Sequence, residues 1–451
     1  MKIEYGIAKR ILNPQVPISL AGYFSDRMWD HVLDDIEVRA IVFRNKEGCA
    51  AILHFDLLSM STNICEGILA ELNKRGVVCF SRENVLFSAI HTHTAPDMCP
   101  GKYPHSEEYR QFVFRQSADA LLEAMADMRE GELYQGLARD SRFLFNRRYW
   151  MKNGSVVTNP GKLNPDIVRP EGDIDPEIPI ISIRRNGRDD VILCSIVNHS
   201  DTVGGTGVSA DWHHFLRTKL MEDTGAEMVF SLLGASGNIN HFDVGTDMDQ
   251  TNYGEARRIG LGYAETVGAA MKNLAPVRGD GWKLLSGIAE STPREVSEEE
   301  IAAARETVRK YADVTFEAGK SFTSEDLAKG APAVLKYFAE RLIIQSENKD
   351  PMFFPLLGFA FGDSAIIASL PSEPFTEIGL DLRKEIFGDR LCLVATLSWT
   401  GQTKNLSGYI PNPWNYGRGG YESAPRSNPF SKKTASRLLA KWRELAEGIN
   451  R

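Results

Sequence analysis

The feature that most constrains the fold of this chain is a repeated alternation between short apolar runs and segments of helical periodicity. Runs with the length of buried strands occupy residues 50–57, 84–90, 190–198, 227–233, 364–370 and 390–399. Apolar residues at helical spacing fill the intervals, at 61–75, from Ser106 onward, and at 209–223, 251–274 and 375–387. We also expect Ser209 to cap the third of these helices. Strands alternating with helices predict an α/β fold with mixed, largely parallel sheets flanked by helices.

Two regions lack this alternation of apolar runs and helical segments. Residues 134–183 are rich in Pro, Asn and Gly and predict a β-hairpin that turns at Asn153-Gly154. Residues 293–349 carry the densest charge of the chain and predict a solvated helical insertion. Neither region has the composition of a flexible linker. We therefore expect residues 1–451 to form a single domain that contains the insertion.

Charge and hydropathy exclude several classes of protein. The formal net charge of −8 argues against a nucleic-acid binder, which usually has a basic balance or a basic face. No run approaches 18 apolar residues, so we expect no membrane span. The N-terminal residues lack the apolar core of a secretory signal, and the six cysteines form no CxxC pair. We expect a cytoplasmic protein that acts on a small molecule; the sequence does not indicate its oligomeric state.

Polar motifs follow each of the predicted strands. In chain order they are Asp56, His91 with His93, Asn198-His199, residues 234–241 (GASGNINH), Ser372-Glu373, and residues 405–409 (NLSGY). In open α/β sheets, ligands bind beyond the carboxyl ends of the strands. If the strands are parallel neighbours, these motifs meet at one edge and form a site.

His91 and His93 are the strongest candidates within this set. Residues two apart in extended chain point to the same side, so both could bind a metal, or one could bind it while the other serves the substrate. The alternative is two ordinary polar residues in a turn. Zinc accepts imidazole and carboxylate ligands, and His199 and Glu373 at matching strand ends favour the metal role. His241 follows Asn238 and Asn240 and could line the same site.

Several common catalytic motifs are absent from the sequence. It contains no GxSxG, HExxH, Walker loop or GxGxxG after the first strand, which disfavours a serine hydrolase of the common type. The stretch GNINHFD is similar to a turn of the metallophosphatases, but the other motifs of that class are missing.

A series of short motifs resembles one known family. In order, they are His91-Thr92-His93-Thr94-Ala95-Pro96, Asn146-Arg147, Asn198-His199 followed by Ser209-Ala210-Asp211, Pro371-Ser372-Glu373, Gly408-Tyr409, and Gly419-Gly420-Tyr421-Glu422. Their order and spacing resemble the catalytic domain of the neutral/alkaline (non-lysosomal) ceramidases. The resemblance covers most of the chain outside the insertion.

This resemblance implies a single Zn²⁺ and a set of residue roles. The ligands would be His91, His199, Glu373 and Tyr409. The residues that face the reacting carbonyl would be His93, Arg147 and Tyr421. In that arrangement the zinc activates a water, His93 relays a proton, and Arg147 with Tyr421 stabilises an oxyanion.

The sequence also departs from the family pattern. A family serine proposed as nucleophile or substrate contact aligns with Asn240, whose amide cannot act as a nucleophile. The family's C-terminal immunoglobulin-like domain and secretion signal have no counterpart here, so we do not expect membrane-derived ceramide as the substrate. We expect a zinc-dependent hydrolase of an amide or related acyl bond in a small soluble substrate. The alternatives are a zinc hydrolase of another bond, such as a glycoside, with Asn240 and His241 reshaping the pocket, and a non-catalytic zinc-containing binding protein.

Overall fold

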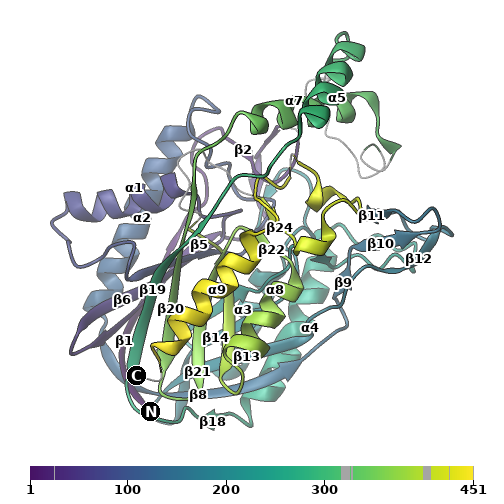
Figure 1. The fold of residues 1–451 in the computed structure, drawn as a ribbon. Coiled ribbons are helices and arrows are strands. Elements are labelled where there is room, and N and C mark those ends of the chain that lie inside the picture. Colours follow the sequence, from purple (N-terminus) through teal and green to yellow (C-terminus); the bar gives the residue numbers. More distant parts are fainter. Residues whose placement is uncertain (25, 316–325, 327–328, 400–407, 426, 450–451) are drawn as a thin grey trace.

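The computed structural model describes residues 1–24, 26–315, 326, 329–399, 408–425 and 427–449, and its main body consists of two β-sheets packed face to face (Figure 1). Among these residues the larger sheet has nine strands in the order β16-β14-β13-β8-β1-β5-β6-β7, with β18 also paired to β8. Its strands are β1 (Lys2–Ile11), β5 (Glu37–Asn45), β6 (Gly48–Phe55), β7 (Val85–Ala89), β8 (Arg129–Arg139), β13 (Glu177–Arg185), β14 (Arg188–Ile196), β16 (Met228–Leu233) and β18 (Ala275–Pro276). The smaller sheet comprises β19 (Trp282–Ser291), β20 (Met352–Phe361), β21 (Ala365–Pro371) and β23 (Leu391–Ser398), in that order.

The apolar core has three parts that correspond to the layers. Between the sheets, Phe43 of the larger sheet packs against Phe359 and Phe361 of the smaller one, with ring centroids 5.3 and 5.4 Å apart. The outer face of the larger sheet is covered by α1 (Thr62–Lys74), α2 (Ser106–Ala126), α3 (Trp212–Thr224) and α4 (Tyr253–Met271). The outer face of the smaller sheet is covered by α8 (Thr376–Asp381) and α9 (Thr434–Glu447). Both faces of each sheet are therefore buried, which explains why the strands read as continuous apolar runs.

The six predicted strands are all present, and they form three parallel pairs: β6 with β7, β14 with β16, and β21 with β23. The mixed α/β fold is thus confirmed. The expectation of largely parallel sheets is wrong, because most of the other pairings are antiparallel, including β1–β5, β5–β6, β8–β13 and β13–β14. The physical reason is the connections: β13 and β14, for example, are joined by a tight turn at Asn186-Gly187, which can only join antiparallel neighbours.

The two irregular regions have the predicted structure where they are described. β10 (Arg148–Met151) and β11 (Val156–Thr158) pair antiparallel around Asn153-Gly154, and Gly154 takes a φ of 80°. The insertion contains α5 (Glu298–Lys310) and α7 (Pro332–Ser346), which project from one end of the molecule in Figure 1; residues 316–325 and 327–328 lie outside the described set.

The start of α3 differs from the prediction. Asp211, and not Ser209, caps this helix by accepting a hydrogen bond from the Trp212 amide. The Ser209 hydroxyl instead donates to the Asp34 carboxylate at 2.6 Å. Among the helices that the structure describes, none is long and apolar enough to cross a membrane.

Candidate metal site and pocket

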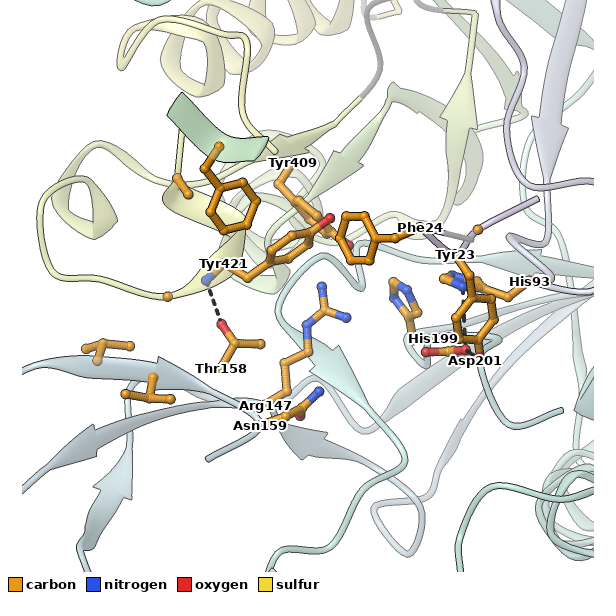
Figure 2. A pocket seen from close by; sticks show the side chains of 16 residues that line it. Tyr23, Phe24, His93, Arg147, Thr158, Asn159, His199, Asp201, Tyr409 and Tyr421 are labelled. Atoms are coloured by element: carbon orange, nitrogen blue, oxygen red, sulfur yellow. Dashed lines mark hydrogen bonds and ion pairs between the residues drawn. The ribbon is translucent and has the colours of Figure 1, made fainter. Parts of the chain in front are cut away.

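Residues that follow three of the predicted strands line one pocket of about 410 Å³ (Figure 2). His93 follows β7, His199 follows β14, and Tyr409 comes after β23. These three strand-end motifs therefore meet as predicted, although their strands belong to two sheets and not to one. Arg147 and Tyr421, which the family resemblance implied, also line the pocket.

His91, His199 and Glu373 lie in direct proximity beside this pocket. The Nε2 atom of His91 is 3.1 Å from Oε2 of Glu373, and Nε2 of His199 is 4.0 Å from the same oxygen. The ring centroids of His91 and His199 are 4.5 Å apart, and that of His93 is 4.9 Å from His91. One nitrogen from each of the three histidines lies within 4.8 Å of the others, so these residues could hold a metal ion.

The hydrogen bonding of this cluster is incomplete in a way that fits a metal. Nδ1 of His91 must carry a proton, because it contacts the Leu58 carbonyl oxygen at 2.7 Å. In a neutral ring, Nε2 then directs a lone pair at the Glu373 carboxylate. Oε2 of Glu373, Nδ1 of His199 and both ring nitrogens of His93 are buried without a hydrogen-bond partner among the described residues. Such atoms are costly to bury, and a cation would accept a lone pair from Oε2 of Glu373 and from one nitrogen of each ring. Imidazole and carboxylate are ligands that suit Zn²⁺.

The electrostatics of the cluster agree with this fit. Burial lowers the pKa of His93 to about 4 although Asp201 opposes the shift, and burial together with the Arg147 charge lowers the pKa of His199 well below its usual value. Burial alone would raise the pKa of Glu373. The interactions with His91 and Arg147 lower it by a larger amount, so the pKa lies below its usual value. Burial lowers the pKa of His91, but the Glu373 carboxylate more than offsets this. At neutral pH, His93 and His199 are therefore neutral and Glu373 is ionised, as metal binding requires. At His91 a metal would have to displace the proton that the Glu373 carboxylate favours.

Unusual backbone conformations place two of these side chains. His91, after β7, has a φ of 66°, and Ser372, immediately before Glu373, has a φ of 58°. Both are left-handed conformations that non-glycine residues rarely adopt, and they turn the chain sharply at the end of a strand. Gly237 packs against the same turn: a Cβ atom there would lie 2.9 Å from the Pro374 carbonyl oxygen and still closer to that of Glu373.

Tyr409 reaches the cluster through a short parallel ribbon. β22 (Glu373–Pro374) pairs with β24 (Tyr409–Ile410), and Tyr409 is directly opposite Glu373. Residues directly opposite each other in a ladder project to the same face. The ribbon therefore brings a phenol beside the carboxylate across a long sequence separation.

Arg147 is fixed by a buried carboxylate. Its Nε donates to Oε1 of Glu422 at 2.7 Å, its Nη2 donates to the Gly237 carbonyl at 2.7 Å, and its guanidinium lies 5.1 Å from the centre of the Tyr409 ring. Glu422 is completely buried and also accepts hydrogen bonds from Arg148 and Thr158. The guanidinium is consequently held at the pocket with little freedom to move.

Asp201 and Tyr23 are site residues that the sequence analysis missed. Oδ1 of Asp201 is 3.4 Å from Nδ1 of His93, and the Tyr23 hydroxyl donates to the same oxygen at 2.7 Å (Figure 2). Asp201 stands two residues after His199, a spacing that could have identified it. Tyr23 lies near the N-terminus in a turn, and no sequence pattern connects it to the histidines.

Two predicted pocket residues do not reach the pocket wall. Nδ2 of Asn240 donates to Oδ1 of Asn159 at 2.9 Å, so Asn240 lies behind a lining residue. Nε2 of His241 donates to the Gln250 carbonyl at 2.7 Å, away from the lining residues. The reason is that β17 (Ile239–Asn240) pairs with β9 (Phe145–Asn146), which anchors this loop beside the site.

One further strand-end motif differs from the site prediction. Asp56 is fully buried and accepts hydrogen bonds from Arg217 at 2.6 and 2.9 Å, so it belongs to a core ion pair. Of the motif at 405–409, Tyr409 lines the pocket, and residues 405–407 lie outside the described set.

The comparison with known proteins gives the same fold. No family model and no curated protein matches the sequence. A solved structure of neutral ceramidase from Pseudomonas aeruginosa matches with a TM-score of 0.71 and 16% identity, covering 100% of this chain and 74% of that chain. A structure of a ceramidase complexed with C2 matches with a TM-score of 0.71 and 15% identity, covering 100% of this chain and 75% of that chain. Over its whole described length, this chain therefore has the fold of the neutral ceramidases, as its motifs predicted.

Proposed function

We propose that this protein is a zinc-dependent hydrolase that cleaves an amide or related acyl bond of a small soluble substrate. The observation that carries the proposal is the convergence of His91, His199 and Glu373, with unpaired buried polar atoms, beside a pocket of about 410 Å³. The two ceramidases of the same fold support it, since ceramide is an amide.

The residues that would hold the metal are His91, His199, Glu373 and Tyr409. His93 is close enough to act as a further donor. When bound, Zn²⁺ acidifies water and polarises a carbonyl group. The site does not need a protein nucleophile for this chemistry, which agrees with an asparagine at position 240.

The other pocket residues supply proton transfer and charge stabilisation. His93 is neutral at pH 7 and can accept a proton, and the nearby Asp201 carboxylate would stabilise the imidazolium that results. Arg147, held by Glu422, presents a fixed positive charge to the pocket. Tyr421 lies across the pocket from the histidines, next to Tyr409 (Figure 2). Together, Arg147 and Tyr421 would stabilise negative charge on a reacting carbonyl oxygen.

Metal analysis combined with a substrate screen tests the proposal. Purified protein is expected to bind Zn²⁺ at near-stoichiometric occupancy and to hydrolyse members of a panel of N-acyl amides in preference to glycosides. His91→Ala and His199→Ala should lose both properties. His105→Ala should keep them, because its side chain is 44% exposed and does not line the pocket. Absence of zinc binding, or equal activity in all three variants, would refute the proposal. Zinc binding with turnover of glycosides only would assign a different bond, and zinc binding without any turnover would indicate a binding protein.

A further inference from the structure

One side of the pocket is built around four aromatic rings, two of which come from the insertion. Phe24 and Tyr421 line the pocket together with Phe338 of α7, and Tyr337 is the neighbour of Phe338 on the same helix. We call these four rings the aromatic wall. We propose that the aromatic wall is a specificity subsite that selects substrates carrying an aryl group next to the amide. The amide in this proposal rests on the proposed function. The binding of the aryl group does not depend on it.

The rings of the aromatic wall are in contact with one another. Phe24 packs edge-to-face on Tyr337 and on Tyr421, with ring centroids 6.0 and 6.3 Å apart and interplanar angles of 86° and 88°. Phe338 packs on Tyr421 with centroids 6.5 Å apart. Aromatic rings favour edge-to-face and offset contacts with further rings, worth about 0.5–1.5 kcal/mol beyond the area buried. A planar aryl group would therefore gain contacts here that a flexible alkyl chain cannot make.

The insertion is attached to the body of the protein near this wall. Nε2 of Gln345, at the end of α7, donates to the Asn428 carbonyl at 3.0 Å, and Gln345 is buried. Asn428 belongs to the segment that follows Tyr421. This bond ties α7 to the segment that carries the Tyr421 ring, so Phe338 is part of a defined surface and not of a freely moving arm.

The lining of the pocket contains further apolar residues, and one of its ends is polar. Val156, Val157 and Ala424 line the pocket in addition to the aromatic wall. His93 and His199 lie at the other end from Tyr421 (Figure 2). A substrate with an apolar ring at one end and an amide at the other matches this distribution. The volume of about 410 Å³ is in the lower part of the range for small-molecule sites, which favours a compact ring over an extended chain.

Binding of ketones tests the subsite without any dependence on catalysis. The probes are phenylacetone, cyclohexylacetone and 2-nonanone, which have equal numbers of carbon atoms and contain no amide bond. Calorimetric titration into the protein of residues 1–451, with and without added Zn²⁺, is expected to show phenylacetone binding roughly two- to tenfold more tightly than the other two. Phe338→Ala should abolish this preference. Ile344→Ala, on an exposed position of the same helix, should retain it.

Phe338→Leu keeps the proposal testable if the alanine variant does not fold. Leucine preserves apolar bulk without a ring, so cyclohexylacetone should bind as in the unmodified protein while the preference for phenylacetone disappears. Equal binding of the three ketones to the unmodified protein, or a retained aryl preference in both Phe338 variants, would overturn the proposal. If the aryl preference is found but no amide is hydrolysed, the proposed function fails and the subsite stands.

Discussion

Nε2 of His91 faces Oε2 of Glu373 at 3.1 Å, while Nδ1 of the same ring donates to the Leu58 carbonyl at 2.7 Å. The nitrogen nearest the carboxylate therefore bears a lone pair unless a proton or a cation lies between the two groups. The carbonyl of Leu58 fixes the tautomer that a metal ligand needs, as outer partners of ligating histidines commonly do.

Glu373→Gln is expected to weaken zinc binding by about tenfold or more, because an amide supplies a weaker donor than a carboxylate and no negative charge. Competition with a chromophoric chelator measures the affinity. Glu306→Gln, at an exposed position of α5, is the matched control and should bind zinc as the unmodified protein does. Equal affinities for the two variants would remove Glu373 from the ligand set.

Asp201→Asn is expected to lower kcat/KM of the zinc-loaded protein by about 10- to 100-fold, since His93 loses the carboxylate that would stabilise its protonated form. Zinc content should not change. Tyr23→Phe removes only the hydrogen bond to Asp201 and should have a smaller effect. Kinetics on the best amide of the screen, with metal content measured on the same samples, checks this; a loss of zinc in the Asp201 variant would contradict the assigned role.

Much of the fold was accessible from the sequence, since the parallel pairs follow from apolar runs separated by helices. The antiparallel strands β1, β5, β8 and β13 were not predicted as elements, and their pairing depends on neighbours far away in the chain. The site residues were found where a motif marks a strand end, as for His91, His199 and Glu373. Asp201 and Tyr23 were missed because their roles come from a contact made only after folding.

Gly237→Ala is expected to destabilise the protein by about 1–3 kcal/mol, because the new methyl group would overlap the carbonyl oxygens of Glu373 and Pro374. Zinc affinity should fall as well, since the overlap displaces Glu373. Gly268→Ala is the control: this glycine lies within α4, and a Cβ atom there would meet only Cδ2 of Leu220 at 3.9 Å, an ordinary contact, so alanine should stabilise by about 0.5–1 kcal/mol. Urea unfolding distinguishes the two; similar stabilities would show that the loop can move away from Glu373.

The core ion pair at Asp56 predicts a pH dependence of stability. Burial alone would raise the pKa of Asp56. The charges of Arg217 and Arg39 lower it by a larger amount, so the pKa in the folded protein lies below its usual value. The unfolded chain, with a pKa of about 3.9, takes up the proton first as the pH falls. The stabilisation is therefore complete above that pKa and is lost as the pH falls through the folded value.

Asp56→Asn is expected to cost about 3–5 kcal/mol at pH 7, because two buried guanidinium groups lose their shared charge partner. It should also flatten the decline in the free energy of unfolding below about pH 5. Denaturant unfolding at a series of pH values measures both effects, with the exposed Asp247→Asn as control. A decline as steep as in the unmodified protein would exclude Asp56 as its source.

The residues proposed to hold the metal are spread along the chain from His91 to Tyr409, and they follow strands of both sheets. A nascent chain on the ribosome would thus possess the first histidines long before it possesses the carboxylate and the phenol. Tight zinc capture should appear only after the two sheets have docked. During refolding, the rate at which zinc becomes resistant to a chelator would consequently measure the rate at which the two sheets dock.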